Sequence, residues 1–437
     1  MRNLFMYFQS KNLFHEYVKL LNPDHFTKLE IFRILYSLLK QIRILKKNIK
    51  KFNLQIQSNL QLVKNIRDLS NDKIELLSIK DRYSSVNSPV VFNTKHDIKS
   101  INSSVLDIDL YLLNNVYLYA KSSLVSDGKL AFSSTLHNYQ PHCDIKNSLR
   151  QSFVSFQKKQ INIHFKKIDI LDDEDVIYIH LLNEHSANYY HWLYELMPKL
   201  ILMNNYIMSN ENYNKKKYIL IIDKNLYTQM LEIIKMIVKF EYQIKELEEF
   251  DGLFCSQLLF CSDFWLSLDN TRFKPNIISE FFVDKYAVTL IRDTFKEYLS
   301  HEKPYRKVYL ERKGARQLLN EKEIKKLLLK FDFEYVDTSL LTFTEQIKLF
   351  SETLVVVGTS GAAFSNIIFM NNVAKAIIFT PNCIAINLYI FQQMADVAEI
   401  ELIHILSKNK HEYIHSDIEI SLNELDNVLN NVCMKNS

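Results

Sequence analysis

Apolar residues recur at heptad spacing between residues 35 and 69. Two seam positions repeat every seven residues, and apolar side chains fill nine of the ten places. In chain order the occupants are Leu35, Leu38, Ile42, Leu45, Ile49, Phe52, Ile56, Asn59, Val63 and Ile66. Such a repeat is typical of a coiled-coil helix, in which one buried Asn can fix the register. We expect residues 1–88 to form a helical region that self-associates as a coiled coil or packs on its own domain.

Residues 89–275 mix two periodicities. Residues 114–134 alternate like two paired strands around an Asp127-Gly128 turn, and residues 175–182 have the pattern of another strand. Residues 189–207 have the spacing of a helix, and short apolar runs typical of buried strands follow them. We therefore expect a mixed α/β domain here.

Strands and helices alternate from residue 304 onward. Apolar, strand-like runs occupy residues 307–312, 333–338, 353–358, 374–380 and 401–406. Helical segments separate the first four of these runs, and an amphipathic helix over 421–432 closes the chain. Alternation of this kind predicts a doubly wound parallel sheet.

The third of these strands ends in a turn that holds two of the five glycines in the chain. The turn and the start of the next helix consist of Gly358, Thr359, Ser360, Gly361 and Ala362. Glycine permits a positive φ or a close approach of the backbone, and N–H groups at a helix start bind anions. Because ligands bind at the carboxyl ends of strands in such sheets, this turn is a candidate diphosphate site. A tight turn without a ligand is the alternative.

The composition allows two to three globular domains. The 437 residues are 47% hydrophobic and 24% charged, which excludes a disordered chain. Five cysteines without CxxC spacing predict free thiols in a reducing compartment, and therefore a cytoplasmic protein without a zinc site. No apolar run is long enough to predict a membrane-spanning helix.

Positive charge is concentrated in the heptad region. Residues 35–69 contain eight Lys and Arg residues against Asp68 alone, a local charge of +7 in a chain whose net charge is +4. This basic face is either solvated or rests on an anionic surface such as the inner face of the cell membrane. Nucleic acid is disfavoured, because no aromatic residues interleave with the lysines.

A candidate acid/base pair lies in the helical segment that starts near residue 189. On a helix, His191 and Glu195 are four residues apart and share a face. An imidazole titrates near neutrality, and a carboxylate beside it raises its basicity. A buried histidine with a local salt link is the alternative.

Three cations cluster where the strand at 307–312 ends: Arg312, Lys313 and Arg316. Cations there would neutralise a departing phosphate, whereas a solvated run of charge is the alternative.

Sequence signals for a metal site are weak. Asp107 and Asp109 lie in a strand-like run, and residues 172–175 have the composition of an acidic turn.

Taken in order, these motifs resemble glycosyltransferase family 61, which includes bacterial capsular polysaccharide biosynthesis proteins and plant and animal xylosyl- and N-acetylglucosaminyltransferases. The family pattern N-Y-x-H-W-x-x-[D/E]-x-x-P is matched by Asn188, Tyr189, His191, Trp192, Glu195 and Pro198. A strand ending in Arg, followed by R-x-L-x-N-E, is matched by Arg312, Arg316, Leu318, Asn320 and Glu321. The segments E-Q-I and G-x-x-G-A-x-x-x-N are matched by Glu345, Gln346, Ile347, Gly358, Gly361, Ala362 and Asn366.

Two positions depart from the family pattern. Tyr190 stands where the family usually has Gly before His-Trp, and Ser360 stands where it usually has His before Gly-Ala. Loss of that His could change the donor, shift its work to His191, or weaken the activity.

The resemblance implies a GT-B-like fold, with two Rossmann-like domains facing a cleft. Residues 89–275 would form the acceptor domain and residues 276–437 the nucleotide-sugar domain. The implied reaction is inverting sugar transfer without a metal or other cofactor. One of His191 and Glu195 would take the acceptor proton. The residues that would hold the donor are Arg312, Arg316, Glu345, Gly358, Thr359, Ser360, Gly361, Ala362 and Asn366, with Glu345 either near the ribose or only capping its helix.

The implied partners are a nucleotide-sugar donor and a glycan or glycolipid acceptor of capsule or surface-polysaccharide synthesis. A homo-oligomer through the heptads is expected, with peripheral membrane contact and no nucleic acid. A non-catalytic coiled-coil scaffold of a polysaccharide-assembly complex is the first alternative. An epimerase or dehydrogenase is the second, but it would need a third glycine and a Tyr-x-x-x-Lys that are not in place.

Overall fold

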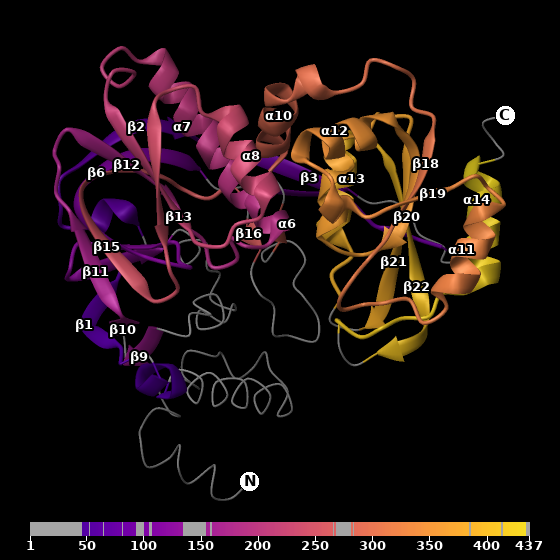
Figure 1. Ribbon diagram of the computed structural model, residues 1–437, viewed down its shortest axis with the longest axis horizontal. Helices are drawn as coiled ribbons and strands as arrows, with labels where there is room; N and C mark the ends of the chain where they lie inside the picture. The colour runs from indigo at the N-terminus through magenta and orange to yellow at the C-terminus, as the bar shows by residue number, and fades with distance from the viewer. Residues whose placement is uncertain are drawn as a thin grey trace, which may run out of the picture.

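The computed structural model contains two lobes, each built on a sheet, with helices between them (Figure 1). The described ranges are 46–51, 53–63, 65–80, 82–92, 100–104, 107–133, 154–157, 160–264, 266–267, 281–282, 284–383, 386–411 and 414–433. We call the part built on the larger sheet the first lobe and the part built on the smaller sheet the second lobe. No helix in these ranges is long and apolar enough to span a bilayer.

The sheet of the first lobe has twelve strands and mixed directions. Its order is β14-β13-β12-β15-β6-β7-β8-β1-β10-β9, with β11 on β15 and β2 on β6. The bounds are β1 (Gln55–Leu62), β2 (Lys73–Ile79), β6 (Ile108–Tyr119), β7 (Leu124–Ser126), β8 (Leu130–Ser133), β9 (Val154–Gln157), β10 (Gln160–Phe165), β11 (Lys167–Leu171), β12 (Val176–Leu181), β13 (Lys217–Asp223), β14 (Tyr242–Leu247) and β15 (Asp251–Cys261). The expected hairpin is confirmed: β7 and β8 are antiparallel, and Gly128 in their turn has φ +93°.

The parallel run β14-β13-β12-β15 positions the helices that face the second lobe. After β12 come α6 (Tyr189–His191), η3 (Trp192–Leu196) and α7 (Met197–Ser209), and α8 (Thr228–Ile237) follows β13. Figure 1 shows α7 and α8 on the side of the first sheet that faces the second lobe. The mixed α/β expectation for this region is confirmed.

The heptad prediction is wrong from residue 55 onward. Residues 46–51 are helical, but Gln55–Leu62 forms β1, which pairs with β10 and β8. The sequence QIQSNLQL also has a period of two, and pairing in the sheet buries Leu60 completely. Asn59 is not a seam residue, because it has φ +63° beside an irregularity in this pairing. The earlier heptads, up to residue 45, lie outside the described residues.

The sheet of the second lobe is parallel throughout, as predicted, with the order β19-β18-β20-β21-β22-β4. Its strands are β4 (Val90–Val91), β18 (Arg306–Leu310), β19 (Glu334–Val336), β20 (Thr353–Thr359), β21 (Lys375–Cys383) and β22 (Glu401–His411). Its helices are α11 (Glu321–Leu329), α12 (Phe343–Glu352), the 3-10 helix η6 (Ala362–Phe369), α13 (Tyr389–Ala398) and α14 (Leu422–Cys433). Alternate residues of β20 serve the two faces: Val355 and Val357 pack in the cluster of α11 and α14, and Val356 in that of α12 and α13.

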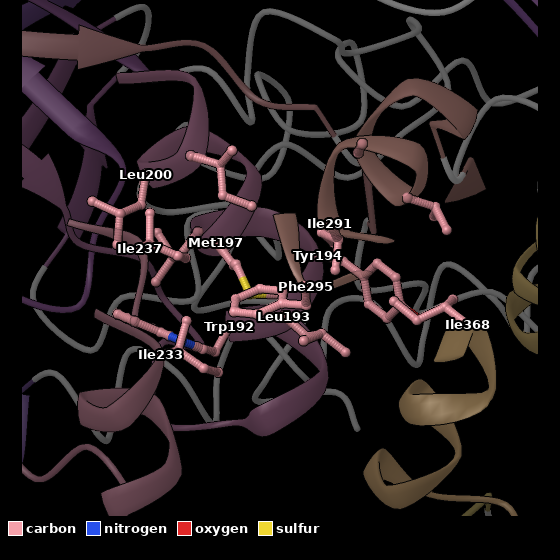
Figure 2. Packing of buried hydrophobic residues seen from close by; sticks show 14 of the residues in the cluster. Trp192, Leu193, Tyr194, Met197, Leu200, Ile233, Ile237, Ile291, Phe295 and Ile368 are labelled. Atoms are coloured by element: carbon pink, nitrogen blue, oxygen red, sulfur yellow. The ribbon is translucent and has the colours of Figure 1, made fainter. Parts of the chain in front are cut away.

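One hydrophobic cluster joins the lobes. It contains residues of α7, α8 and α10 (Lys285–Thr294) together with residues of α12, η6 and α13. Figure 2 shows Trp192, Met197 and Phe295 in this cluster, with Ile368 of η6 at its edge. The helices of both lobes therefore pack tightly against one another in a single core.

Short elements complete the described fold. β3 (Tyr83–Asn87) pairs with β5 (Ser100–Ser104), and β16 (Leu266–Ser267) pairs with β17 (Phe281–Phe282). The remaining 3-10 turns are η2 (Ile66–Asp68), η4 (Lys296–Tyr298) and η5 (Thr338–Leu340).

A buried ion pair between Lys199 of α7 and Asp263, just after β15, supports the first lobe. Both side chains are almost fully buried. Asp263→Ala would leave the Lys199 ammonium buried without its partner, so we expect it to lower the free energy of unfolding by about 3–5 kcal/mol in urea denaturation. The apolar double variant Lys199→Met/Asp263→Leu is the control and should recover most of this loss. A single-variant loss below about 1 kcal/mol would contradict a buried pair.

Candidate active site

The predicted contact between His191 and Glu195 is present. Asn188 caps α6 by accepting a hydrogen bond from the backbone N–H of Tyr190 at 2.9 Å. One turn later, His191 Nδ1 lies 2.7 Å from Glu195 Oε1, and the two side chains are only 15% and 9% exposed. The loop after β12 therefore starts a helix whose first turns hold a partly buried acid/base pair.

The helix carrying this pair is not a regular α-helix. Residues Trp192–Leu196 form a π-helical turn, closed by the N–H of Met197 bonding to the carbonyl of Trp192. Pro198 follows at the start of α7. Its ring has no N–H and would clash with the carbonyl of Tyr194 in a regular helix, which accounts for the wider turn. Such π-turns are frequent at functional sites.

Asn183 completes the surroundings of Glu195. Its Nδ2 donates to Glu195 Oε2 at 2.8 Å, and its Oδ1 accepts from the backbone N–H of His185 at 2.8 Å. Both oxygens of Glu195 are thus engaged. Because a carboxylate only accepts hydrogen bonds, His191 Nδ1 is the donor of its pair. In the neutral ring, Nε2 is then the nitrogen that can accept a proton.

A cavity of about 440 Å³ lies between the lobes next to this pair. Its lining consists of Lys121, Glu184, His185, Ala187, Asn188, Tyr189 and Tyr227 of the first lobe and Ala362 of the second. His185 connects the cavity to the acid/base pair, because its ring lies against that of His191 with the centroids 4.6 Å apart. The cavity is therefore the candidate reaction chamber.

A buried aspartate holds Lys121 at this cavity. The backbone N–H of Lys121 donates to Asp223 Oδ1 at 2.6 Å, and Lys121 has φ +56°, which is unusual for a residue other than glycine. Burial raises the pKa of the Asp223 carboxyl, against the opposing effect of Lys121. Lys121 Nζ donates to Ser186 Oγ at 3.2 Å. A cation is thus fixed at the rim of the chamber.

The glycine turn lies at the switch point of the second sheet. β18 and β20 are neighbours in the sheet, and chain order reverses between them, which opens a crevice at their carboxyl ends. Positive φ is not the reason for the glycines, since neither Gly358 nor Gly361 adopts it. Close approach is the reason: a Cβ at Gly358 would lie 3.1 Å from the carbonyl oxygen of Leu310, and one at Gly361 would overlap the guanidinium of Arg312.

Arg312 and Arg316 both lie against this turn. Arg312 Nε donates to the carbonyl of Ala315 at 2.6 Å, and burial lowers the pKa of its guanidinium. Arg316 Nη1 donates to the carbonyl and to the hydroxyl of Ser360, at 2.8 and 3.0 Å. Arg316 Nη2 lies 3.3 Å from His415 Nδ1. The structure thus joins both arginines, Ser360 and Gly361 in one cationic cluster.

The other predicted donor-binding residues are buried or already hydrogen-bonded within the protein. Thr359 is buried, and Asn366 is fully buried between Tyr189 and Gln346. Glu345 is occupied by the predicted capping box, in which its Oε2 accepts from the backbone N–H and the hydroxyl of Thr342 at 2.8 Å each. That bonding lowers the pKa of the Glu345 carboxyl. Asn320, which precedes α11, makes no side-chain capping bond to that helix, because its amide pairs with the backbone of Ile420.

Several site residues were missed from the sequence. Asn183 and His185 directly follow an apolar strand, and that position could have indicated them. Lys121, Tyr227 and His415 come from turns far away in the chain and carried no local signal. Among the described residues, no group of three or more His, Cys, Asp or Glu side chains could hold a metal ion.

Comparison with known protein families gives a match to part of the chain. The family model described as Glycosyltransferase 61 matches residues 189–377. The match begins at the first residue of α6 and ends in β21, so it includes the acid/base pair, both arginines and the glycine turn. No curated protein matches the chain.

Asn183→Ala tests the support of the acid/base pair. The variant deprives buried Glu195 of one of its two donors, so we expect the free energy of unfolding to fall by about 1–3 kcal/mol. Urea unfolding measures it. Asn212→Ala, at an exposed loop position, is the matched control and should stay within about 0.5 kcal/mol of the parent protein. Equal values for the two variants would show that Asn183 does not support Glu195.

Proposed function

We propose that this chain, whose residues 189–377 belong to glycosyltransferase family 61, transfers a sugar from a nucleotide sugar to a glycan acceptor with inversion at the anomeric carbon. Family membership supplies the transferase activity. One observation carries the finer proposal: a single cavity is lined by His185, whose ring lies against His191 of the acid/base pair, and by Ala362, the residue that follows the arginine-bound glycine turn. The two facing lobes support a GT-B-like arrangement.

On the acceptor side, His191 Nε2 is the proposed general base. Glu195 is the weaker candidate, because it is buried and both of its oxygens already accept hydrogen bonds. When the imidazole takes the proton of the acceptor hydroxyl, the adjacent carboxylate stabilises the positive ring. Glu195 thus orients His191 and supports its charge, while Asn183 holds Glu195.

On the donor side, Arg312 and Arg316 are the proposed ligands of the diphosphate. Charge on the departing diphosphate grows as the sugar leaves, and fixed guanidinium groups stabilise that charge without rearrangement. His415, in contact with Arg316, adds a third group at this position. We propose that these residues stabilise the leaving group without a metal ion or other cofactor.

The placement of the two groups supports inversion. In a single displacement the acceptor oxygen attacks the anomeric carbon from the side opposite the leaving diphosphate. A base on the first lobe and phosphate ligands on the second would allow these events to occur on opposite sides of the sugar. A double displacement would instead need a nucleophile beside the sugar.

We place the reaction in the cytoplasm, in the synthesis of a bacterial capsule or other surface polysaccharide. Cys255, Cys261 and Cys383 are free and buried, which supports a reducing compartment. The scaffold alternative has less support than the transferase, because β1 replaces the second half of its coiled coil. We also propose that the part of the heptad region before β1 forms an oligomer and that its basic face contacts the membrane.

His191→Gln is the direct test of the base. We expect kcat for sugar transfer to fall by about 10²–10⁴-fold while the KM for the donor stays within about twofold, since the base does not touch the diphosphate. His301→Gln, at an exposed histidine before β18, is the control and should keep full activity. Transfer by His191→Gln at the rate of the control would eliminate His191 as the base.

Donor binding is tested by thermal shift with UDP-, GDP-, CMP- and dTDP-sugars, with and without Mg²⁺. We expect a metal-independent rise in Tm for one nucleotide and about 10- to 100-fold weaker binding in Arg316→Ala, the loss expected for charged hydrogen bonds. Lys313→Ala is the charge-matched control, because Lys313 is 80% exposed and pairs with Asp337. Equal binding by both variants would remove Arg316 from the donor site.

A further inference from the structure

A chain of hydrogen bonds links the acid/base helix to the helix after the glycine turn. The Tyr189 hydroxyl donates to Asn366 Oδ1 at 2.8 Å, and Asn366 Nδ2 donates to Gln346 Oε1 at 2.8 Å. Asn366 is 0% exposed and Gln346 4%. Burial raises the pKa of the Tyr189 hydroxyl, so it keeps its proton and remains a donor.

The same network returns to the first lobe. Gln346 Nε2 donates to the carbonyls of Thr338 and Leu341, at 3.0 and 3.3 Å. From the first lobe, Gln229 Nε2 donates to the same Leu341 carbonyl at 2.8 Å. The bonds thus form a continuous path from α6 through η6, α12 and the loop before α12 to α8.

Two neighbouring contacts strengthen this path. The Tyr194 hydroxyl donates to the carbonyl of Ser365 at 2.6 Å. Glu232 of α8 accepts from the backbone N–H of Phe343 at 2.7 Å, at the start of α12. Around them lies the apolar cluster of Figure 2, in which Tyr194 and Ile368 are labelled. The bond between Asn366 and Gln346 in the middle of the path is buried, and a buried hydrogen bond is harder to replace with water.

We infer that Tyr189, Asn366 and Gln346 are positioning residues that fix the distance between the proposed base and the donor turn. We call these three residues the lobe clamp. Tyr189 is two residues before His191, and Asn366 is five residues after Gly361, so the clamp fixes the two halves of the site through short stretches of helix. The expected effect on sugar transfer rests on the proposed function. The fixed position of α6 relative to η6 does not.

The geometry assigns Asn366 to this role rather than to donor binding. Its Oδ1 accepts from Tyr189, and its Nδ2 donates to Gln346 and, at 3.4 Å, to the carbonyl of Ala363. The side chain is fully buried and its amide is engaged within the protein. A displacement of reacting groups by about 1 Å can cost about 100-fold in rate, which gives a remote clamp a large effect.

Tyr189→Phe tests the clamp by removing one hydroxyl. We expect kcat for transfer to fall by about 10- to 100-fold with the donor KM within about twofold. Tyr218→Phe is the matched control, because Tyr218 is a buried tyrosine whose hydroxyl bonds to the Tyr213 carbonyl within the first lobe. The control should lose comparable stability but keep its kcat. Equal kcat values for the two variants would overturn the catalytic role.

Hydrogen exchange measures the clamp without any sugar transfer. In Tyr189→Phe, amides of both α6 and η6 should exchange roughly fivefold faster than in the parent protein, whereas Tyr218→Phe should leave η6 unchanged. Unchanged exchange in η6 of Tyr189→Phe would overturn the clamp. If the parent protein transfers no sugar from any donor but the exchange difference is present, the proposed function fails and the clamp stands.

Discussion

A buried carboxylate needs a donor for each of its oxygens, and Glu195 obtains them from Asn183 and His191. This requirement connects the local features of the first lobe. It fixes the loop after β12, because Asn183 must turn its amide inward. It also fixes the proton on Nδ1 of His191 and leaves Nε2 as the basic nitrogen. Removing either donor would leave one oxygen of this buried carboxylate without a hydrogen bond, so the chemistry of the site and the stability of the helix start depend on the same few bonds.

The second condition for the site is that its two halves share a core. The helix that carries His191 contributes Trp192, Leu193 and Tyr194 to the cluster between the lobes (Figure 2), and η6 contributes Ile367 and Ile368 to the same cluster. Apolar packing brings these helices together but does not fix their exact register, because it is not directional. Hydrogen bonds between buried side chains are directional. The clamp residues therefore add geometric definition where two separate sheets must act on one sugar.

How much of the protein could be predicted from the sequence depended on whether its interactions were local. The second sheet was predictable, because strands buried on both faces are long apolar runs between amphipathic helices. The pair at His191 and Glu195 follows from helical spacing, and the capping box at Thr342 and Glu345 from a four-residue pattern. The heptad pattern predicted a helix where the chain forms β1. A period of seven and a period of two coexist in residues 55–62, and only pairing with β10 and β8 decides between them. Lys121 and His415 reach the site through long-range contacts that no local pattern encodes.

Ser360 stands where the family pattern usually has a histidine, and it still binds an arginine. Its hydroxyl and carbonyl accept from Arg316, whose φ of +63° is uncommon for an arginine and directs the guanidinium to the turn. The backbone that follows this arginine is fixed by bonds to the segment around Ile418, including Leu319 N–H to the Ile418 carbonyl at 2.8 Å. The same segment brings His415 to Nη2 of the Arg316 guanidinium. A histidine distant in sequence thus contacts the arginine that binds the turn from which the expected histidine is missing, and the cationic cluster at the carboxyl ends of β18 and β20 has an imidazole beside it.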